Sequence, residues 1–168
     1  YARYEFDGRF NKEYSTTRSF AMRLNAGIVM PFGESKVAPF VRQFGVGGPN
    51  SLRAWNVKQP GPGAYRNPLD KLTEVPPIYV NKGDIRLELN AEYRFTAVGF
   101  LDGALFVDAG NVWTLRNDVN RPGAVFSKNF LNQVAIGAGY GIRFNFDFFV
   151  IRFDFGYKLR NPYFDEYK

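Results

Sequence analysis

A chain of 168 residues that is 45% apolar can bury a core, so its size excludes little. Cysteine and histidine are both absent, which excludes disulfides and thiolate metal sites and removes the commonest general base and most zinc sites. The net charge of +6 comes from scattered Lys and Arg residues, a distribution that argues against nucleic-acid binding.

The first half of the chain predicts three strands. Residues Tyr1–Phe10 and Thr17–Phe32 alternate apolar with polar side chains, and Val37–Val46 alternates less regularly around Phe40 and Phe44. A period of two places one set of side chains on each face of a strand. The aromatic content of 18% favours the same interpretation, because aromatic side chains prefer strands and collect at membrane interfaces.

The second half predicts four more strands. Asp84–Ala97 is the most regular, since every second residue from Ile85 is apolar and every residue between is polar. Leu101–Trp113, Val134–Phe146 and Phe149–Arg160 repeat the pattern. The sequence therefore predicts about seven strands and no helix, with strands longer than those of most globular proteins.

The predicted connections alternate in length. Short links are expected at Phe32–Lys36, Ala97–Phe100 and Asn145–Phe148, and longer ones at Asn11–Thr16, Gly47–Gly83 and Thr114–Gln133. Outer-membrane barrels join their strands by short periplasmic turns and longer extracellular loops. The alternation thus favours a transmembrane barrel, and strands of ten or more residues suit a tilted crossing of the bilayer.

Two all-β antiparallel architectures fit this periodicity. In a soluble barrel the apolar face points inward, whereas in a transmembrane barrel it points outward to lipid. Alternation alone does not separate them. Strand length, loop lengths and the glycines at 137, 139 and 141 favour the membrane barrel.

Three motifs make the sequence more specific. They are Gly47–Trp55 (GGPNSLRAW), Phe106–Trp113 (FVDAGNVW), and the pair Gly137–Arg143 and Arg152–Tyr157 with the patterns GxGxGxR and RxDxGY. In order and spacing they resemble the BamA/TamA superfamily of outer-membrane barrel-assembly proteins, also known as the bacterial surface antigen type. The first motif is similar to the family's sixth extracellular loop, and the region 147–162 favours the TamA-like branch.

The resemblance implies a fold and a place within it. Residues 1–168 are expected to form the C-terminal part of a larger, sixteen-stranded transmembrane barrel, without its final strand. Earlier strands and periplasmic domains are expected to precede this sequence. The long extracellular loop at 47–83 is expected to fold into the barrel lumen.

Arg53 is the central residue of the predicted site. If the loop enters the lumen, the guanidinium needs a carboxylate partner, and inward-facing positions supply Glu92 and Asp108. The family resemblance implies contacts of Arg53 with Asp108 and Phe106. The predicted site residues of the loop motif are Gly48, Leu52, Arg53, Ala54 and Trp55. We expect Arg53, Glu92 and Asp108 to hold the loop and close the lumen rather than to contact a substrate directly.

Ala54 departs from the family's pattern, because a glycine is typical there and alanine does not readily adopt positive φ angles. Trp55, Trp113, Tyr157 and Tyr163 are either interface anchors or interior packing, and the sequence leaves this open. The remaining inward charges are expected to form cross-strand pairs in a wet lumen. These are Arg86, Glu88, Arg94, Arg143, Arg152 and Asp154.

The carboxylates do not indicate an enzyme, because no nucleophile–base pair or metal-ligand spacing accompanies them, and no cofactor is expected. The resemblance implies an outer-membrane protein that assists insertion, assembly or translocation of other outer-membrane proteins. Its partners would be membrane lipid, client proteins, and periplasmic or lipoprotein subunits. Two alternatives are a passive protein-export pore of the two-partner secretion type and a structural or lipoprotein-export component of the envelope.

Overall fold

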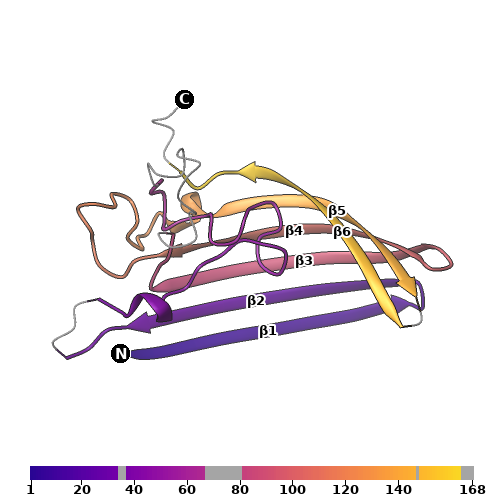
Figure 1. Cartoon of the computed structure of the whole chain (residues 1–168), viewed down its shortest axis with the longest axis horizontal. Helices are drawn as coiled ribbons and strands as arrows, with labels where there is room; N and C mark the ends of the chain where they lie inside the picture. Colours follow the sequence, from indigo (N-terminus) through magenta and orange to yellow (C-terminus); the bar gives the residue numbers. More distant parts are fainter. Residues whose placement is uncertain (34–36, 67–80, 147, 164–168) are drawn as a thin grey trace.

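The computed structural model describes residues 1–33, 37–66, 81–146 and 148–163, which form one six-stranded antiparallel sheet in the order β1-β2-β3-β4-β5-β6 (Figure 1). The strands are β1 (Ala2–Ser15), β2 (Arg18–Met30), β3 (Ile85–Val98), β4 (Leu101–Trp113), β5 (Ala135–Phe146) and β6 (Phe149–Arg160). In the described parts of the long connections lie two short 3-10 turns, η1 (Phe40–Arg42) and η4 (Phe130–Gln133). No helix among the described residues is long and apolar enough to cross a membrane.

Six of the seven predicted strands are present, and the prediction of a strand at Val37–Val46 was wrong. That segment forms the turn η1 and then a single bridge between Phe44 and Gly83. The tip of the Phe44 ring lies against β2, where a Cβ added to Gly27 would meet Cζ at 2.7 Å. The alternation of this segment therefore reflects packing against the sheet rather than pairing within it.

Two of the predicted connections are also corrected. β1 continues to Ser15, so the expected loop at Asn11–Thr16 is a two-residue turn, and Phe32–Lys36 belongs to a long connection whose residues 34–36 lie outside the described part. Short turns still alternate with long connections along the chain. Figure 1 shows the short turns at one end of the sheet and the two long connections, from β2 to β3 and from β4 to β5, at the other.

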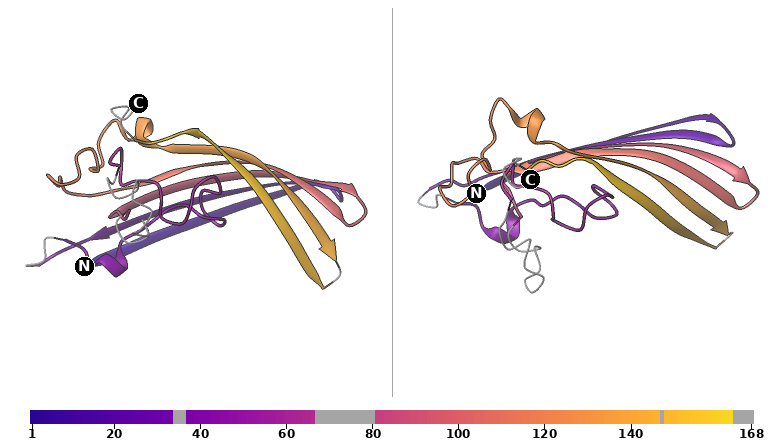
Figure 2. Two further views of the ribbon diagram at one scale, coloured as in Figure 1. Left: turned by 45° about the horizontal axis from the view of Figure 1, so that its top comes forward. Right: turned by 90° about the horizontal axis from the view of Figure 1, so that it is seen from above.

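The two faces of the sheet are the reverse of those in a water-soluble protein. Along β4, Phe106 and Asp108 are buried, whereas Leu105 and Val107 are 55% and 48% exposed. The polar face is the concave one, and the loop of residues 37–66 lies against it (Figure 2). The opposite face presents apolar side chains outward, as lipid requires. This distribution selects the membrane barrel over the soluble one.

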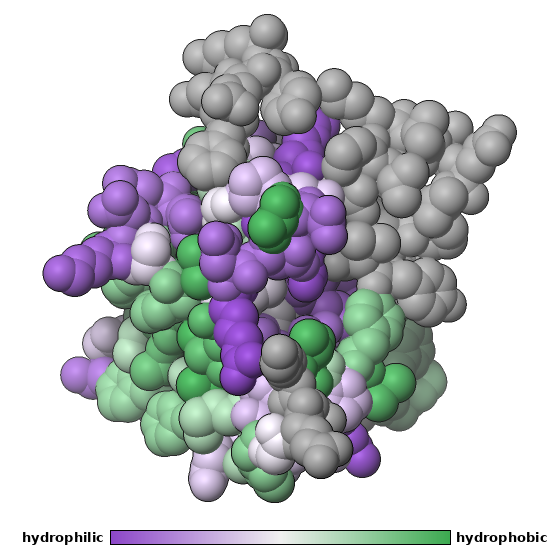
Figure 3. Space-filling model, turned by 90° about the vertical axis from the view of Figure 1, so that its left-hand side faces the viewer, coloured by the Kyte–Doolittle hydropathy of each residue, from purple (hydrophilic) through white to green (hydrophobic). Residues whose placement is uncertain are grey.

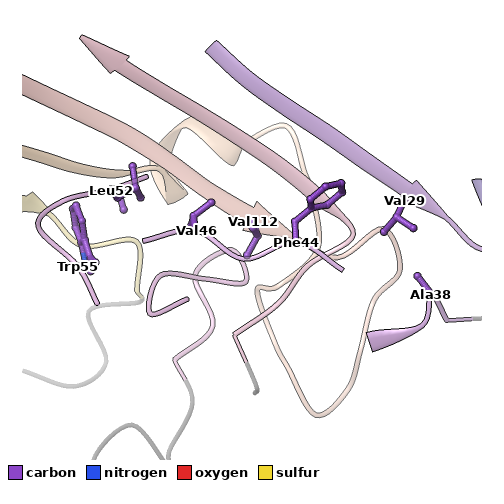
Figure 4. Packing of buried hydrophobic residues seen from close by; sticks show 8 residues of the cluster. Val29, Ala38, Phe44, Val46, Leu52, Trp55 and Val112 are labelled. Atoms are coloured by element: carbon purple, nitrogen blue, oxygen red, sulfur yellow. The ribbon is translucent and has the colours of Figure 1, made fainter. Parts of the chain in front are cut away.

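A small apolar core joins the loop to the long-connection end of the sheet. Figure 4 shows its members converging from the loop, from β2 and from β4. They are Val29, Ala38, Phe44, Val46, Leu52, Trp55, Val112 and Ala135. Seen from this end, hydrophilic residues gather in the upper part of the molecule and hydrophobic residues lie below them (Figure 3). The core thus fixes the loop at one end of an otherwise polar interior.

Two alanines on neighbouring strands test which face meets lipid. Ala91 faces outward on β3, and Ala21 faces the polar interior of β2 beside Glu92. In the full-length barrel, Ala91→Arg should lower the free energy of folding into lipid vesicles by about 2–4 kcal/mol if the site lies near the bilayer midplane. Ala21→Arg should have a smaller effect, because its charge enters a wet, polar interior rather than lipid, although arginines already bind the neighbouring Glu92. A urea titration measures both, and equal losses would contradict the assignment of the faces.

Candidate functional site

The loop motif folds into a compact turn of its own. Gly47 and Gly48 take positive φ angles of 106° and 92°, and the Gly48 N–H donates to the Trp55 carbonyl at 2.9 Å. A Cβ added to Gly47 would lie 2.2 Å from the Asn56 carbonyl oxygen. Both the backbone angle and the close approach therefore require glycine at position 47.

Arg53 leaves this turn and binds the wall of the sheet. Its Nε and Nη2 donate to the two carboxylate oxygens of Asp108 at 2.9 and 2.8 Å, and its backbone N–H donates to the same carboxylate at 3.0 Å. Nη1 donates to Glu92. The Phe106 ring lies under the guanidinium at 3.5 Å. Bidentate geometry and ring stacking are features that arginine supplies and lysine does not.

The site is buried enough for these contacts to matter. The side chains of Arg53, Glu92 and Asp108 are 7%, 9% and 1% exposed. Burial by itself would lower the pKa of Arg53, but the hydrogen bonds that Arg53 donates to Asp108 and Glu92, and the charges of these carboxylates, outweigh it and raise that pKa above its ordinary value. Arg53 is therefore charged at any physiological pH, and its ion pairs with Asp108 and Glu92 are not lost through deprotonation of the arginine.

Glu92 also binds two arginines that the sequence did not assign to it. Arg94 Nε donates to the carboxylate at 2.6 Å, and Arg143 Nη2 donates to the same oxygen from β5. Together with Arg53, three guanidinium groups surround one carboxylate. The contact from β5 reaches β3 across β4, so it joins three strands under the loop.

The tip of the loop is held by side chains from three strands. Arg23 of β2 donates to the Asn50 carbonyl at 3.2 Å, and Arg152 of β6 donates to the Pro49 carbonyl at 3.2 Å. Asn90 of β3 donates to the Ser51 carbonyl at 2.7 Å and to Asp108 at 2.9 Å. The sequence did not predict these donors. Their acceptors are backbone carbonyls, which every residue has, so the residue types give no sign of the contacts.

Glycines on β5 and β6 let the loop backbone reach the wall. A Cβ added to Gly156 would lie 2.9 Å from Ala54 Cα, and one added to Gly137 would lie 2.9 Å from Ala54 Cβ. Under the Phe106 ring, a Cβ on Gly139 would meet Cζ at 2.5 Å. Ala54 itself is unstrained, since Lys58 is the only non-glycine residue of the described part with a positive φ. The departure from the family's glycine is thus tolerated.

A second attachment holds the loop further along the chain. The Gly63 N–H donates to the Val112 carbonyl at 2.7 Å, on a stretch of β4 beyond its last pair with β5 at Gly110. The buried Asn111 amide donates to Gly63 O at 2.9 Å and also to Gln133 O. Asn111 therefore ties this loop to the connection between β4 and β5.

The four aromatic residues left open by the sequence divide into two groups. Trp55 and Trp113 are buried as packing residues, whereas Tyr157 is 62% exposed on the outward face. Tyr163 is half-buried and its hydroxyl donates to the Gln59 carbonyl at 3.0 Å. Of these four residues, only Tyr157 therefore has the outward-facing, exposed position expected of an anchor at the membrane interface.

The remaining inward charges form both the expected cross-strand pairs, such as that of Arg143 with Glu92, and pairs along a single strand. Arg152 and Asp154 pair along one strand at 2.9 Å, as do Arg86 and Glu88 at 4.0 Å. Arg86 also reaches Glu5 at 3.6 Å across β2. Beside the loop tip, a cavity of about 560 Å³ is lined largely by polar side chains, including Arg23. Within the described residues no cluster of acidic side chains could hold a metal ion.

Comparisons with known proteins identify the family of the chain. A model of the Omp85 superfamily domain matches residues 1–168, the whole of the sequence. The chain belongs to the Omp85 superfamily. It is an outer-membrane β-barrel chain, as the resemblance to BamA and TamA implies, while assignment to the TamA-like branch stays a prediction.

Among solved structures, the chain is similar to the crystal structure of BamA from Haemophilus ducreyi lacking POTRA domains 1-3, with 20% sequence identity and a TM-score of 0.68. The match covers 94% of this chain and 31% of that chain, so this sequence spans about a third of the BamA chain. No curated protein matches the sequence.

Replacing Arg53 tests whether its ion pairs with Asp108 and Glu92 hold the loop against the wall. Arg53→Ala leaves Asp108 and Glu92 without their shared cation, and breaking a buried pair in this way costs about 3–5 kcal/mol. In the full-length protein in intact membranes, the loop should then be cleaved faster by protease near Trp55. Arg42→Ala is the matched control, because Arg42 is exposed. Cleavage of Arg53→Ala at the wild-type rate would show that the pair does not hold the loop.

Proposed function

We propose that the full-length protein assists the insertion and assembly of other β-barrel proteins in the outer membrane, and that this chain supplies the C-terminal part of its barrel with the loop inside the lumen. The short turns then face the periplasm and the long connections face outward. Of the loop predicted at 47–83, residues 67–80 lie outside the described part. Clients, lipid and periplasmic or lipoprotein subunits are the proposed partners, and no enzymatic step is involved.

The observation that supports assembly over export is the attachment of the loop to the inner wall. Arg53 binds two carboxylates, and separate donors from β2, β3 and β6 hold the loop tip. Passing a polypeptide through the lumen would require these buried contacts to break together. Insertion at an edge of the barrel sheet leaves them intact. There, unpaired N–H and C=O groups can pair with an incoming strand.

Export of a protein partner through the lumen is the second candidate. Related two-partner secretion transporters work in this way, and the polar interior beside the loop would accept a chain if the loop moved out. The two functions differ in whether the loop must leave its place. A role in lipoprotein export is a further alternative. It would be recognised if depletion of the full-length protein caused loss of lipoproteins alone.

A covalent link between loop and wall separates the two candidates. Ala54 on the loop and Gly137 on β5 are neighbours: a Cβ added to Gly137 would lie 2.9 Å from Ala54 Cβ, so a disulfide there requires the loop to move slightly away from the wall. The sequence contains no cysteine of its own. In the full-length protein, the Ala54→Cys/Gly137→Cys variant would be compared in its oxidised, disulfide-bonded state and its reduced state. If the protein assembles barrels with the loop in place, both states should assemble unrelated barrel proteins to the same extent. The measurement is the amount of folded client barrels per cell.

The reduced variant is the control for any distortion caused by the cysteines. Loss of client barrels only in the oxidised state would contradict assembly with a fixed loop. Depleting the unmodified protein gives an independent readout, because the assembly role predicts loss of many unrelated barrels and the export role predicts loss of one secreted partner.

A further inference from the structure

The connection between β4 and β5 lies on the outward face of the sheet, opposite the 37–66 loop (Figure 2). Trp113 ends β4 on the outward side, and its ring contacts Phe126 edge-on, with ring centroids 5.4 Å apart. Phe130 packs in the same manner at 6.0 Å, and the indole N–H donates to Gln133 at 2.7 Å. The connection is thus folded back over the apolar surface and fixed there.

This folding leaves a groove between the connection and the sheet. The groove has a volume of about 380 Å³ and lies between Phe126 and the outward side chains of three strands. Its apolar lining comprises Tyr4, Phe6, Ile28, Ile85, Leu87 and Phe126. Glu5 and Arg86 also border it, but they belong to the polar face, where Arg86 donates to Asn25. The groove therefore offers an occupant almost only apolar contact.

The groove is continuous with the surface that meets lipid. Tyr4 and Phe6 remain 61% and 57% exposed on its floor, and Phe126 is 42% exposed on its wall. Surrounding bilayer lipid touches the outward face everywhere, but here a loop also confines the lipid from the side. An extended acyl chain is the occupant that such a walled apolar groove fits.

The charge of the connection indicates the headgroup. Residues 114–134 contain three basic side chains, Arg116, Arg121 and Lys128, against the single acid Asp118, a net charge of 3 − 1 = +2. Arg121 pairs with Asp118 at 2.8 Å, while Arg116 and Lys128 are exposed. Lys128 is two residues from Phe126 in the chain, and a cation at this position favours a lipid whose headgroup carries phosphate.

We propose that the groove under Phe126 is a binding site for an acyl chain of a phosphorylated glycolipid of the outer leaflet. The site rests on the proposed orientation, in which the long connections lie at the outer surface. It is independent of the Arg53 contacts, which lie on the other face of the sheet.

Photocrosslinking in native outer membranes tests the site. Full-length protein carrying Phe126→p-benzoyl-phenylalanine should form a crosslink to phosphorylated glycolipid, and the same probe at Phe148, at the opposite end of the sheet, should not. Ala26 borders the groove, so Ala26→Trp should fill it and abolish the crosslink at position 126. Ala91→Trp is the matched control, because Ala91 faces outward on β3 away from the groove.

Each other outcome overturns the proposal. A crosslink at position 126 that survives Ala26→Trp, or that forms only to phospholipid or protein, would show that the groove does not hold the glycolipid. Glycolipid at Phe148 instead of Phe126 would show that the barrel is oriented the other way. Gel mobility of the unheated barrel confirms folding of each variant. Client assembly is measured separately, so failure of the assembly role leaves the crosslink result unaffected.

Discussion

The pairing of one loop arginine with two carboxylates of the wall organises the interior of this sheet. Removing a guanidinium from water is costly unless carboxylates and hydrogen bonds replace the lost hydration. Arg53 obtains them from Asp108 and Glu92, with Phe106 against its planar face. Three features of the chain follow from that need: acids on the inward positions of β3 and β4, glycines where the loop backbone meets β5 and β6, and a tight glycine turn that aims the arginine at the wall.

The reversed faces of the sheet make such a site possible. In a soluble barrel the inward positions would be filled by apolar packing, and a charged cluster would have no place there. Here the outward positions carry the apolar residues, and the inward ones carry Asn25, Glu88, Glu92 and Asp108. The loop therefore finds a polar wall along its length. Apolar packing is confined to the end of the sheet, where Phe44, Leu52 and Trp55 anchor the loop.

The two long connections use the two faces of the sheet differently. The 37–66 loop enters the polar side, and the 114–134 connection covers part of the apolar side. Asn111 lies where they meet and donates to a carbonyl of each. The order of β4 beyond its last pair with β5 thus depends on both connections. This arrangement explains why the last three residues of β4 and Thr114, which follows them, are buried although they lie at the rim.

The sequence predicted the strands wherever one face is uniformly apolar, and Ile85–Val98 is the clearest case. It failed at Val37–Val46, because Phe44 and Val46 alternate to pack on the sheet rather than to pair in it. The end of β1 was missed because Asn11, Lys12 and Glu13 break the alternation with three consecutive polar residues.

The candidate site was only partly predictable for a related reason. Because every second residue of a strand faces inward, the sequence alone predicted Glu92 and Asp108 as partners of Arg53. The structure places these groups in contact. The donors to the loop tip were not predictable, since Arg23 and Arg152 bind backbone carbonyls. Such contacts depend on the path of the loop, which no periodicity in the strands specifies. The role of the site in assembly stays a prediction.

The most direct test of the account is a double-mutant cycle between Arg53 and Asp108 in the full-length protein. The free energy of unfolding in lipid vesicles would be measured for wild type, Arg53→Met, Asp108→Asn and the double variant. If the buried pair holds the loop, the two effects should be strongly non-additive, with a coupling energy at the upper end of the range of about 0.5–3 kcal/mol known for contacting residues. Additive effects, with coupling near zero, would show that Arg53 and Asp108 act independently and would contradict the account.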